Sequence, residues 1–115
     1  MSHSPIDLPT FEALQKTAGA DFVVELVDTF LGEAPAMLGD LRSALAASDA
    51  DRFRRGAHSL KSNSMTFGAL TLGGMARALE LGGIGPVQQA NGEPLDRLDE
   101  EYARVAQALT ELRNA

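Results

Sequence analysis

The chain has 115 residues, the size of a single domain, and a chain of this length can bury roughly two thirds of the surface that its unfolded form exposes. It contains no cysteine, which excludes disulfides, thiolate metal sites and a cysteine nucleophile. The formal net charge of -6 argues against nucleic acid as the partner, because binding to a polyanion depends on Lys and Arg side chains that neutralise phosphates.

The hydropathy of the chain gives no sign of a membrane segment. No stretch approaches the ~20 consecutive apolar residues that a spanning helix needs. The opening residues 1–7 lack the basic-then-apolar order of a signal peptide. We therefore expect a soluble, cytoplasmic protein that binds no membrane.

Helical periodicity runs through the chain, whereas strand signals are nearly absent. A first short helix is expected to open at Thr10, whose hydroxyl can cap free backbone amides, and to end near Gly19. A second helix begins around Asp21 and carries an apolar stripe for about seven turns: Val23, Leu26, Phe30, Ala34, Met37, Leu41 and Leu45. We expect Pro35 to bend this helix without splitting it, because the phase of the stripe continues through the proline.

The second half of the chain is predicted to contain three further helices and one connection. Ser48 and Asp49 offer a cap and a turn, and a third helix is predicted over residues 50–66, closed by Phe67 and Gly68. A fourth helix ends at the glycine-rich run 82–86, and the connection from Gly82 to Pro94 receives no assignment. The fourth and last helices are predicted from apolar residues spaced by three and four: Leu72, Ala76 and Leu79, then Leu95, Leu98, Tyr102, Val105, Leu109 and Leu112.

These elements predict an all-α protein, an antiparallel up-and-down four-helix bundle with a short extra N-terminal helix. It should form a single domain over residues 1–115, with residues 1–8 flexible. Because such a bundle closes its core within one chain, we expect a monomer.

The third predicted helix separates a core face from an outer face that contains a histidine. At 100° per residue, Phe53, Ala57, Leu60, Ser64 and Phe67 fall within about 40° of one line, which is the core face. His58 lies about 140° from that line, and Arg54, Lys61, Ser62 and Met65 share its outer sector with Arg55 beside them. The segment from residue 52 to residue 79 has five basic and no acidic residues, which leaves -11 on the rest of the chain. We therefore expect an exposed imidazole surrounded by cations.

A histidine presented in this way can act as a nucleophile. The unperturbed imidazole has a pKa of about 6.5, so its neutral form has a free lone pair that can attack an activated phosphorus. Positive charge around the ring would favour this neutral form and would attract the phosphoryl group once it is bound. Lys61 lies about one turn from His58 and could reach the phosphoryl oxygens, while Gly68 would leave room for an approaching surface.

The run Ala57-His58-Ser59-Leu60-Lys61-Ser62-Asn63-Ser64, followed by Phe67-Gly68-Ala69, resembles the signature of the histidine-containing phosphotransfer (HPt) domain of bacterial multistep phosphorelays. The family is a four-helix bundle with a short N-terminal helix, so the resemblance covers essentially the whole chain. It implies that His58 is the phosphoacceptor, that Lys61 contacts the phosphoryl group, and that Ser62 and Gly68 provide steric clearance.

The resemblance also implies the partners. HPt domains exchange phosphoryl groups with the aspartate of response-regulator receiver domains, and hybrid histidine kinases belong to the same pathways. The receiver holds the Mg²⁺, so no cofactor or metal is expected on this chain. It should be a carrier and not an enzyme, with the receiver bound by Arg54, Arg55, Ser62, Met65 and Gly68.

Other interpretations remain open from the residues alone. His58 could be an ordinary surface histidine, and the chain could be a helical adaptor of the same fold that is never phosphorylated. It could also be part of a chemotaxis-type kinase. A metal or cofactor bundle is disfavoured, because it would commonly use Glu-x-x-His pairs and the sequence has none.

Overall fold

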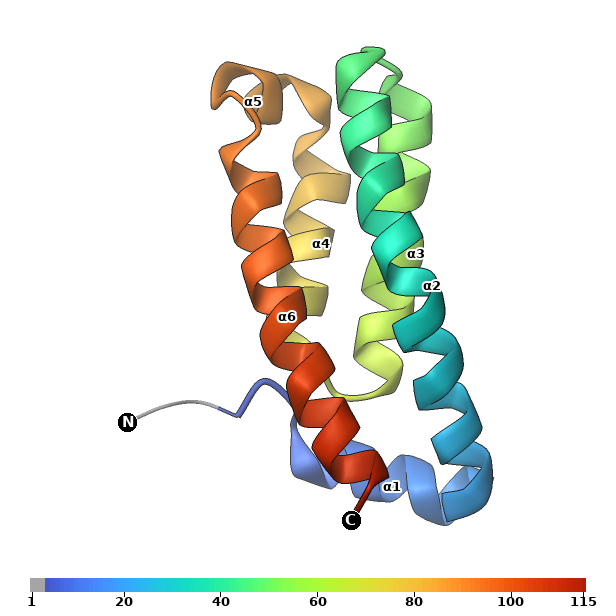
Figure 1. The fold of residues 1–115 in the computed structure, drawn as a ribbon. Coiled ribbons are helices and arrows are strands. Elements are labelled where there is room, and N and C mark those ends of the chain that lie inside the picture. Colours follow the sequence, from blue (N-terminus) through green and yellow to red (C-terminus); the bar gives the residue numbers. More distant parts are fainter. Residues whose placement is uncertain (1–3) are drawn as a thin grey trace.

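The computed structural model describes residues 4–115, and this range is almost entirely helical. It contains α1 (Leu8–Ala18), α2 (Ala20–Ala46), α3 (Ala50–Thr66), α4 (Leu70–Gly82), α5 (Ile84–Gln89) and α6 (Glu93–Arg113). Figure 1 shows α2, α3, α4 and α6 side by side in alternating directions, with α1 across one end of the bundle and the short α5 at the other. The predicted all-α fold and bundle architecture are confirmed.

The first helix begins earlier than predicted, and Thr10 is not its cap. The helix starts at Leu8, and the carboxylate of Asp7 accepts a hydrogen bond from the Thr10 backbone N–H at 3.2 Å. Pro9 follows in the first turn, where a missing N–H costs nothing because that donor would have no partner within the helix. An aspartate before a first-turn proline is therefore the stronger helix start.

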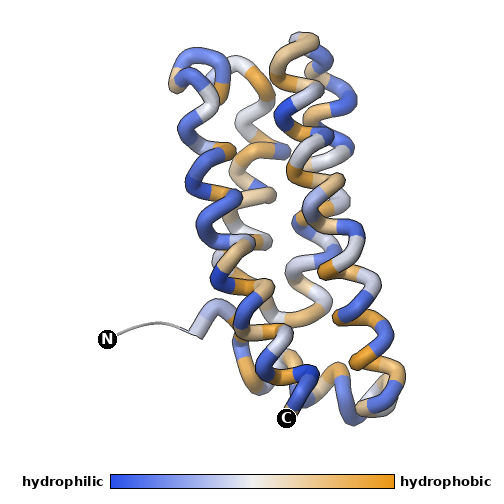
Figure 2. The backbone as a smooth tube through the Cα atoms, viewed as in Figure 1, coloured by the Kyte–Doolittle hydropathy of each residue, from blue (hydrophilic) through white to orange (hydrophobic). Residues whose placement is uncertain are grey.

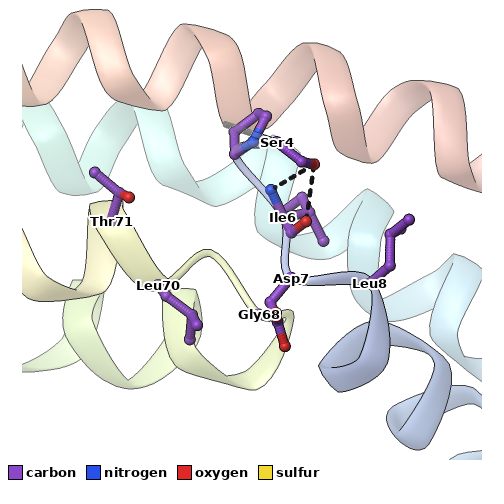
Figure 3. A pocket seen from close by; sticks show the side chains of 8 residues that line it. Ser4, Ile6, Asp7, Leu8, Gly68, Leu70 and Thr71 are labelled. Carbon is purple, nitrogen blue, oxygen red and sulfur yellow. Dashed lines mark hydrogen bonds between the residues drawn. The ribbon is translucent and has the colours of Figure 1, made fainter. Parts of the chain in front are cut away.

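The segment before α1 is packed against the turn between α3 and α4. We expected residues 1–8 to be flexible, but Ile6 is 1% exposed and the Asp7 N–H donates to the Gly68 carbonyl at 2.8 Å. Residues 1–3 lie outside the described part of the chain. A cleft of about 500 Å³ lies at this junction. Figure 3 shows the side chains that line it and the hydrogen bonds between the Ser4 hydroxyl and the backbone of Ile6.

The second helix runs without interruption through Pro35, which is exposed, so the prediction that the proline does not split this helix is confirmed. Its buried stripe differs from the predicted one near both ends and at Met37, which is only partly buried. Val27 and Ala44 are fully buried, whereas Leu26 and Leu45 are only partly buried. Over seven turns a small error in the assumed helical period is enough to move the buried line by one residue.

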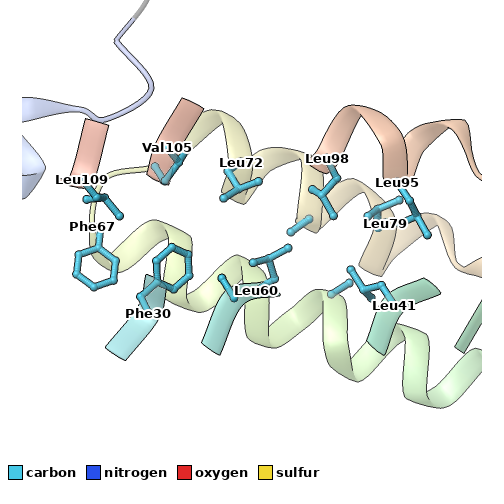
Figure 4. Packing of buried hydrophobic residues seen from close by; sticks show 14 of the residues in the cluster. Phe30, Leu41, Leu60, Phe67, Leu72, Leu79, Leu95, Leu98, Val105 and Leu109 are labelled. Atoms are coloured by element: carbon cyan, nitrogen blue, oxygen red, sulfur yellow. The ribbon is translucent and has the colours of Figure 1, made fainter. Parts of the chain in front are cut away.

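The helices pack around one hydrophobic core. Figure 2 shows hydrophobic and hydrophilic residues alternating along each long helix, as amphipathic helices require. Side chains from α2, α3, α4 and α6 meet in the interior, among them Leu41, Leu60, Leu72 and Leu98 (Figure 4). The predicted core face of α3 is confirmed, because all five of its members are buried: Phe53, Ala57, Leu60, Ser64 and Phe67.

The connection left unassigned by the sequence contains α5. Val87 of this short helix is buried in the core cluster. The Gln88 side chain donates a hydrogen bond to the Ser48 hydroxyl at 3.0 Å, which ties α5 to the turn between α2 and α3. The helix thus closes the end of the bundle opposite α1.

None of the helices described in residues 4–115 has the length and apolarity to cross a membrane.

Candidate functional site

His58 lies midway along α3 on the side that faces away from the core. Its neighbours Ala57 and Leu60 are fully buried, whereas the His58 side chain is 55% exposed. The helical period alone produces this placement, since a residue about 140° from the buried line must point outward. The predicted exposure of the imidazole is therefore confirmed.

A glutamate on the neighbouring helix holds the imidazole in place. Nδ1 of His58 lies 2.7 Å from Oε2 of Glu80 on α4, and Nζ of Lys61 lies 2.9 Å from the other oxygen of the same carboxylate. The Glu80 side chain is only 15% exposed, so α3 and α4 hold it in a defined position between the two. One carboxylate therefore links the histidine to the lysine predicted to act with it.

The charge on Glu80 determines which ring nitrogen is free. Lys61 first, and His58 second, lower the pKa of the Glu80 carboxyl below its ordinary value. The group is then ionised and can only accept hydrogen bonds, so the proton of the neutral imidazole must sit on Nδ1. The lone pair of that ring is consequently on Nε2, which has no hydrogen-bond partner within residues 4–115.

Sequence reasoning missed Glu80, although a signal for it was present. Glu80 directly follows the segment from residue 52 to residue 79, which has no acidic residue. His58 and Glu80 lie eleven residues before and after Ala69, in the turn between α3 and α4. In an antiparallel helical hairpin, residues equally distant from the turn come to the same level.

The expected ring of cations around His58 is wrong. Arg52 pairs with Asp40 at 3.0 Å, and Arg54 and Arg55 pair with Asp51 at 3.0 Å and 2.9 Å. Asp51 directly precedes the basic segment in α3, and Asp40 lies twelve residues before Arg52 on α2, where helix packing brings the two into contact. Of the segment's five cations, only Arg77 has no ion pair among the residues that the structure describes.

Two of the other predicted partner contacts lie on the outer face of α3. Ser62 and Met65 are exposed on the same side as His58. Lys61 is bound to Glu80, so its contact with a phosphoryl group stays a prediction.

In residues 4–115 there is no group of three or more His, Asp or Glu side chains placed to hold a metal ion.

Besides ending α3, Gly68 has a second structural role that the sequence did not suggest. It is buried, with a positive φ of 82°, and a Cβ atom there would lie 2.8 Å from the Asp7 carbonyl oxygen and 2.9 Å from Thr10 Cβ. The missing side chain thus makes room for the N-terminal segment of the same chain. This contrasts with the expectation that Gly68 clears space for a second protein.

Comparisons with known proteins agree with this geometry. The model of the Hpt domain family matches residues 25–115. The chain is also similar to the crystal structure of histidine-containing phosphotransfer protein B (HptB) from Pseudomonas aeruginosa PAO1, with 31% sequence identity and a TM-score of 0.87 over 98% of this chain and 97% of that one. Comparison with curated proteins found no match. The chain therefore belongs to the Hpt domain family and is a histidine phosphotransfer carrier of phosphorelays.

Proposed function

We propose that the chain carries a phosphoryl group on Nε2 of His58 and exchanges it with the aspartate of a receiver domain. The observation that carries this proposal is the contact between Nδ1 and Glu80, because it leaves the other ring nitrogen free on an exposed side chain. A second protein can reach that nitrogen without any rearrangement of the bundle.

The transfer step balances with the groups present. The Nε2 lone pair attacks the phosphorus of an aspartyl phosphate, so an N–P bond forms as the P–O bond to the aspartate breaks. The aspartate leaves as a carboxylate, and the ring keeps its Nδ1 proton and becomes a cation. Glu80 stabilises this cation at a distance of 2.7 Å. The return reaction is the same step in reverse, with the neutral ring as the leaving group.

Lys61 offsets the negative charge that Glu80 brings to the site. An unpaired carboxylate next to the ring would repel the incoming phosphoryl group. Lys61 pairs with Oε1 of Glu80, and its ammonium has three N–H donors, so it can hold the carboxylate and also reach a phosphoryl oxygen. The predicted phosphoryl contact by Lys61 is compatible with its ion pair.

The partner supplies most of the catalytic groups. A receiver domain brings the aspartate and the Mg²⁺, and this chain adds a nucleophile with a fixed tautomer, so it acts as a carrier and not as an enzyme with turnover. We propose that receiver domains, including those of hybrid histidine kinases, contact the exposed Arg54, Arg55, Ser62 and Met65. We further propose that the chain works in the cytoplasm as a monomer.

The test is transfer from a panel of phosphorylated receiver domains to the wild-type chain and to two histidine variants. We expect wild type and His3→Gln to accept the label and His58→Gln to accept none while keeping its helical circular dichroism. The product should lose its label in acid and keep it in base, as a phosphoramidate does. Label on the His58→Gln chain, or label that survives acid, would reject the assignment.

The same experiment separates the carrier from a helical adaptor. If the chain were an adaptor, its wild-type and His58→Gln forms would bind a receiver equally well, and neither form would accept label. A carrier accepts label only when His58 is present.

A further inference from the structure

The outer face of α4 next to His58 has two exposed side chains that the transfer chemistry does not use. Leu81 is 70% exposed, the highest value among the large hydrophobic residues found to be exposed, and it directly follows Glu80. Arg77 is exposed and is the cation of the basic segment that lacks an ion pair within residues 4–115. Leu81 is not part of the hydrophobic core cluster of the described residues.

The helical period places both residues on the side of α4 toward solvent. With Glu80 as the reference, Arg77 lies about 60° and Leu81 about 100° around the helix in one direction, while the buried Leu79 lies about 100° in the other. Gly73, four residues before Arg77, continues the same row. Arg77 and Leu81 therefore form a ridge that runs along the α3–α4 groove in which Glu80 sits.

The far end of this ridge is joined to α3 by Met65. A Cβ atom on Gly73 would lie 2.8 Å from Met65 Cε, so the methionine side chain crosses from α3 onto α4 at that glycine. Met65 is itself partly exposed. The surface around the imidazole thus combines apolar atoms at both ends with one free guanidinium, which is the composition of a protein interface with a charged rim.

We propose that the receiver domain approaches His58 from the α4 side and that Arg77 and Leu81 determine which receivers dock. This inference rests on the proposed function, because it takes a receiver as the partner. The phosphoryl pocket of a receiver is acidic, and Arg77 is the unneutralised positive charge of the basic segment that can pair with it. The ring is also held next to α4 through Glu80, so the exposed face of this helix borders the imidazole that a partner must reach.

The chain offers a matched control for each residue at the α1 end of the bundle. Lys16, in α1, is an exposed cation without an ion pair within the described residues, and Phe22, in the first turn of α2, is 50% exposed. Using the receiver that phosphorylates wild type fastest, we would measure transfer rates for Arg77→Ala, Leu81→Ala, Lys16→Ala and Phe22→Ala. Thermal unfolding would confirm that all four variants stay folded.

We expect Arg77→Ala and Leu81→Ala to lower kcat/KM by about fivefold or more, as interface contacts of this kind do, with little change in kcat at saturation. The wild-type kcat/KM should fall with added salt, and that of Arg77→Ala should fall less. The two controls should match wild type. Four variants equal to wild type would overturn the proposal, and so would a defect confined to the two controls. A wild-type chain that accepts no phosphoryl group would instead refute the proposed function.

Discussion

Replacing Gly68 by alanine tests whether this glycine serves the fold or the partner. The backbone at Gly68 has φ +82°, a conformation that costs a residue with a Cβ atom about 1–2 kcal/mol. The added Cβ would also lie 2.8 Å from a backbone oxygen of Asp7 and 2.9 Å from Thr10 Cβ, and overpacking of this kind costs about 1–3 kcal/mol. Gly68→Ala should therefore lower the free energy of unfolding by about 2–5 kcal/mol.

Urea unfolding followed by circular dichroism measures this loss, which should shift the midpoint by about 1 M or more. The matched control is Gly74→Ala, an exposed position within α4 where a Cβ would meet nothing within 4 Å, and where alanine should stabilise the helix by about 0.5–1 kcal/mol. At temperatures where both variants are folded, each should accept phosphoryl groups at the wild-type rate. A Gly68→Ala protein that is as stable as wild type yet slow in transfer would refute the internal role and would support clearance for the partner.

Three further predictions concern the carboxylate beside the histidine. Glu80→Gln should stay folded but slow transfer about tenfold, because the neutral amide cannot stabilise the ring cation. Single-turnover kinetics with one receiver would measure the rate, and an unchanged rate would exclude the role given to Glu80. Because the pKa of Glu80 is lowered, its ion pairs stabilise the fold above the ordinary pKa of about 4.5, and this contribution is lost as the pH falls through the lowered pKa. Wild type should therefore lose more stability in acid than Glu80→Gln does. Urea midpoints measured over a range of acidic pH values would show the difference. Lys61→Ala should still accept label, but several-fold more slowly, because Glu80 then repels the phosphoryl group. The double variant Lys61→Ala with Glu80→Gln should lose less activity than the product of the two single losses. A loss equal to that product would argue against this coupling.

Features that depend on neighbouring residues could be predicted from the sequence. The bounds of α3 follow from Asp49, whose carboxylate accepts from the Arg52 N–H at 3.1 Å, and from the glycine after Phe67. The exposure of His58 follows from the period of the same helix. Both are local, since capping and helical phase involve residues only a few positions apart.

The sequence-based prediction failed for the N-terminal cap of α1, where a stronger capping residue was overlooked, and for the short α5, which depends on tertiary contacts. Asp7 is a better cap than Thr10, and the proline after Leu8 was the signal for it. The six-residue α5 has too few turns to show a periodicity, and it is held by the burial of Val87 and the bond from Gln88 to Ser48, 40 residues away.

The sequence by itself determined an all-helical bundle with one imidazole on its outer face, because a period of 3.6 residues assigns each side chain of a helix to the core or to water. Only the tertiary structure decided what surrounds that imidazole. Glu80 reaches Nδ1 across the α3–α4 hairpin, and Asp7 fills the space that Gly68 leaves open. Such contacts join residues far apart in the chain, and their distances depend on how the helices pack, which no local pattern encodes.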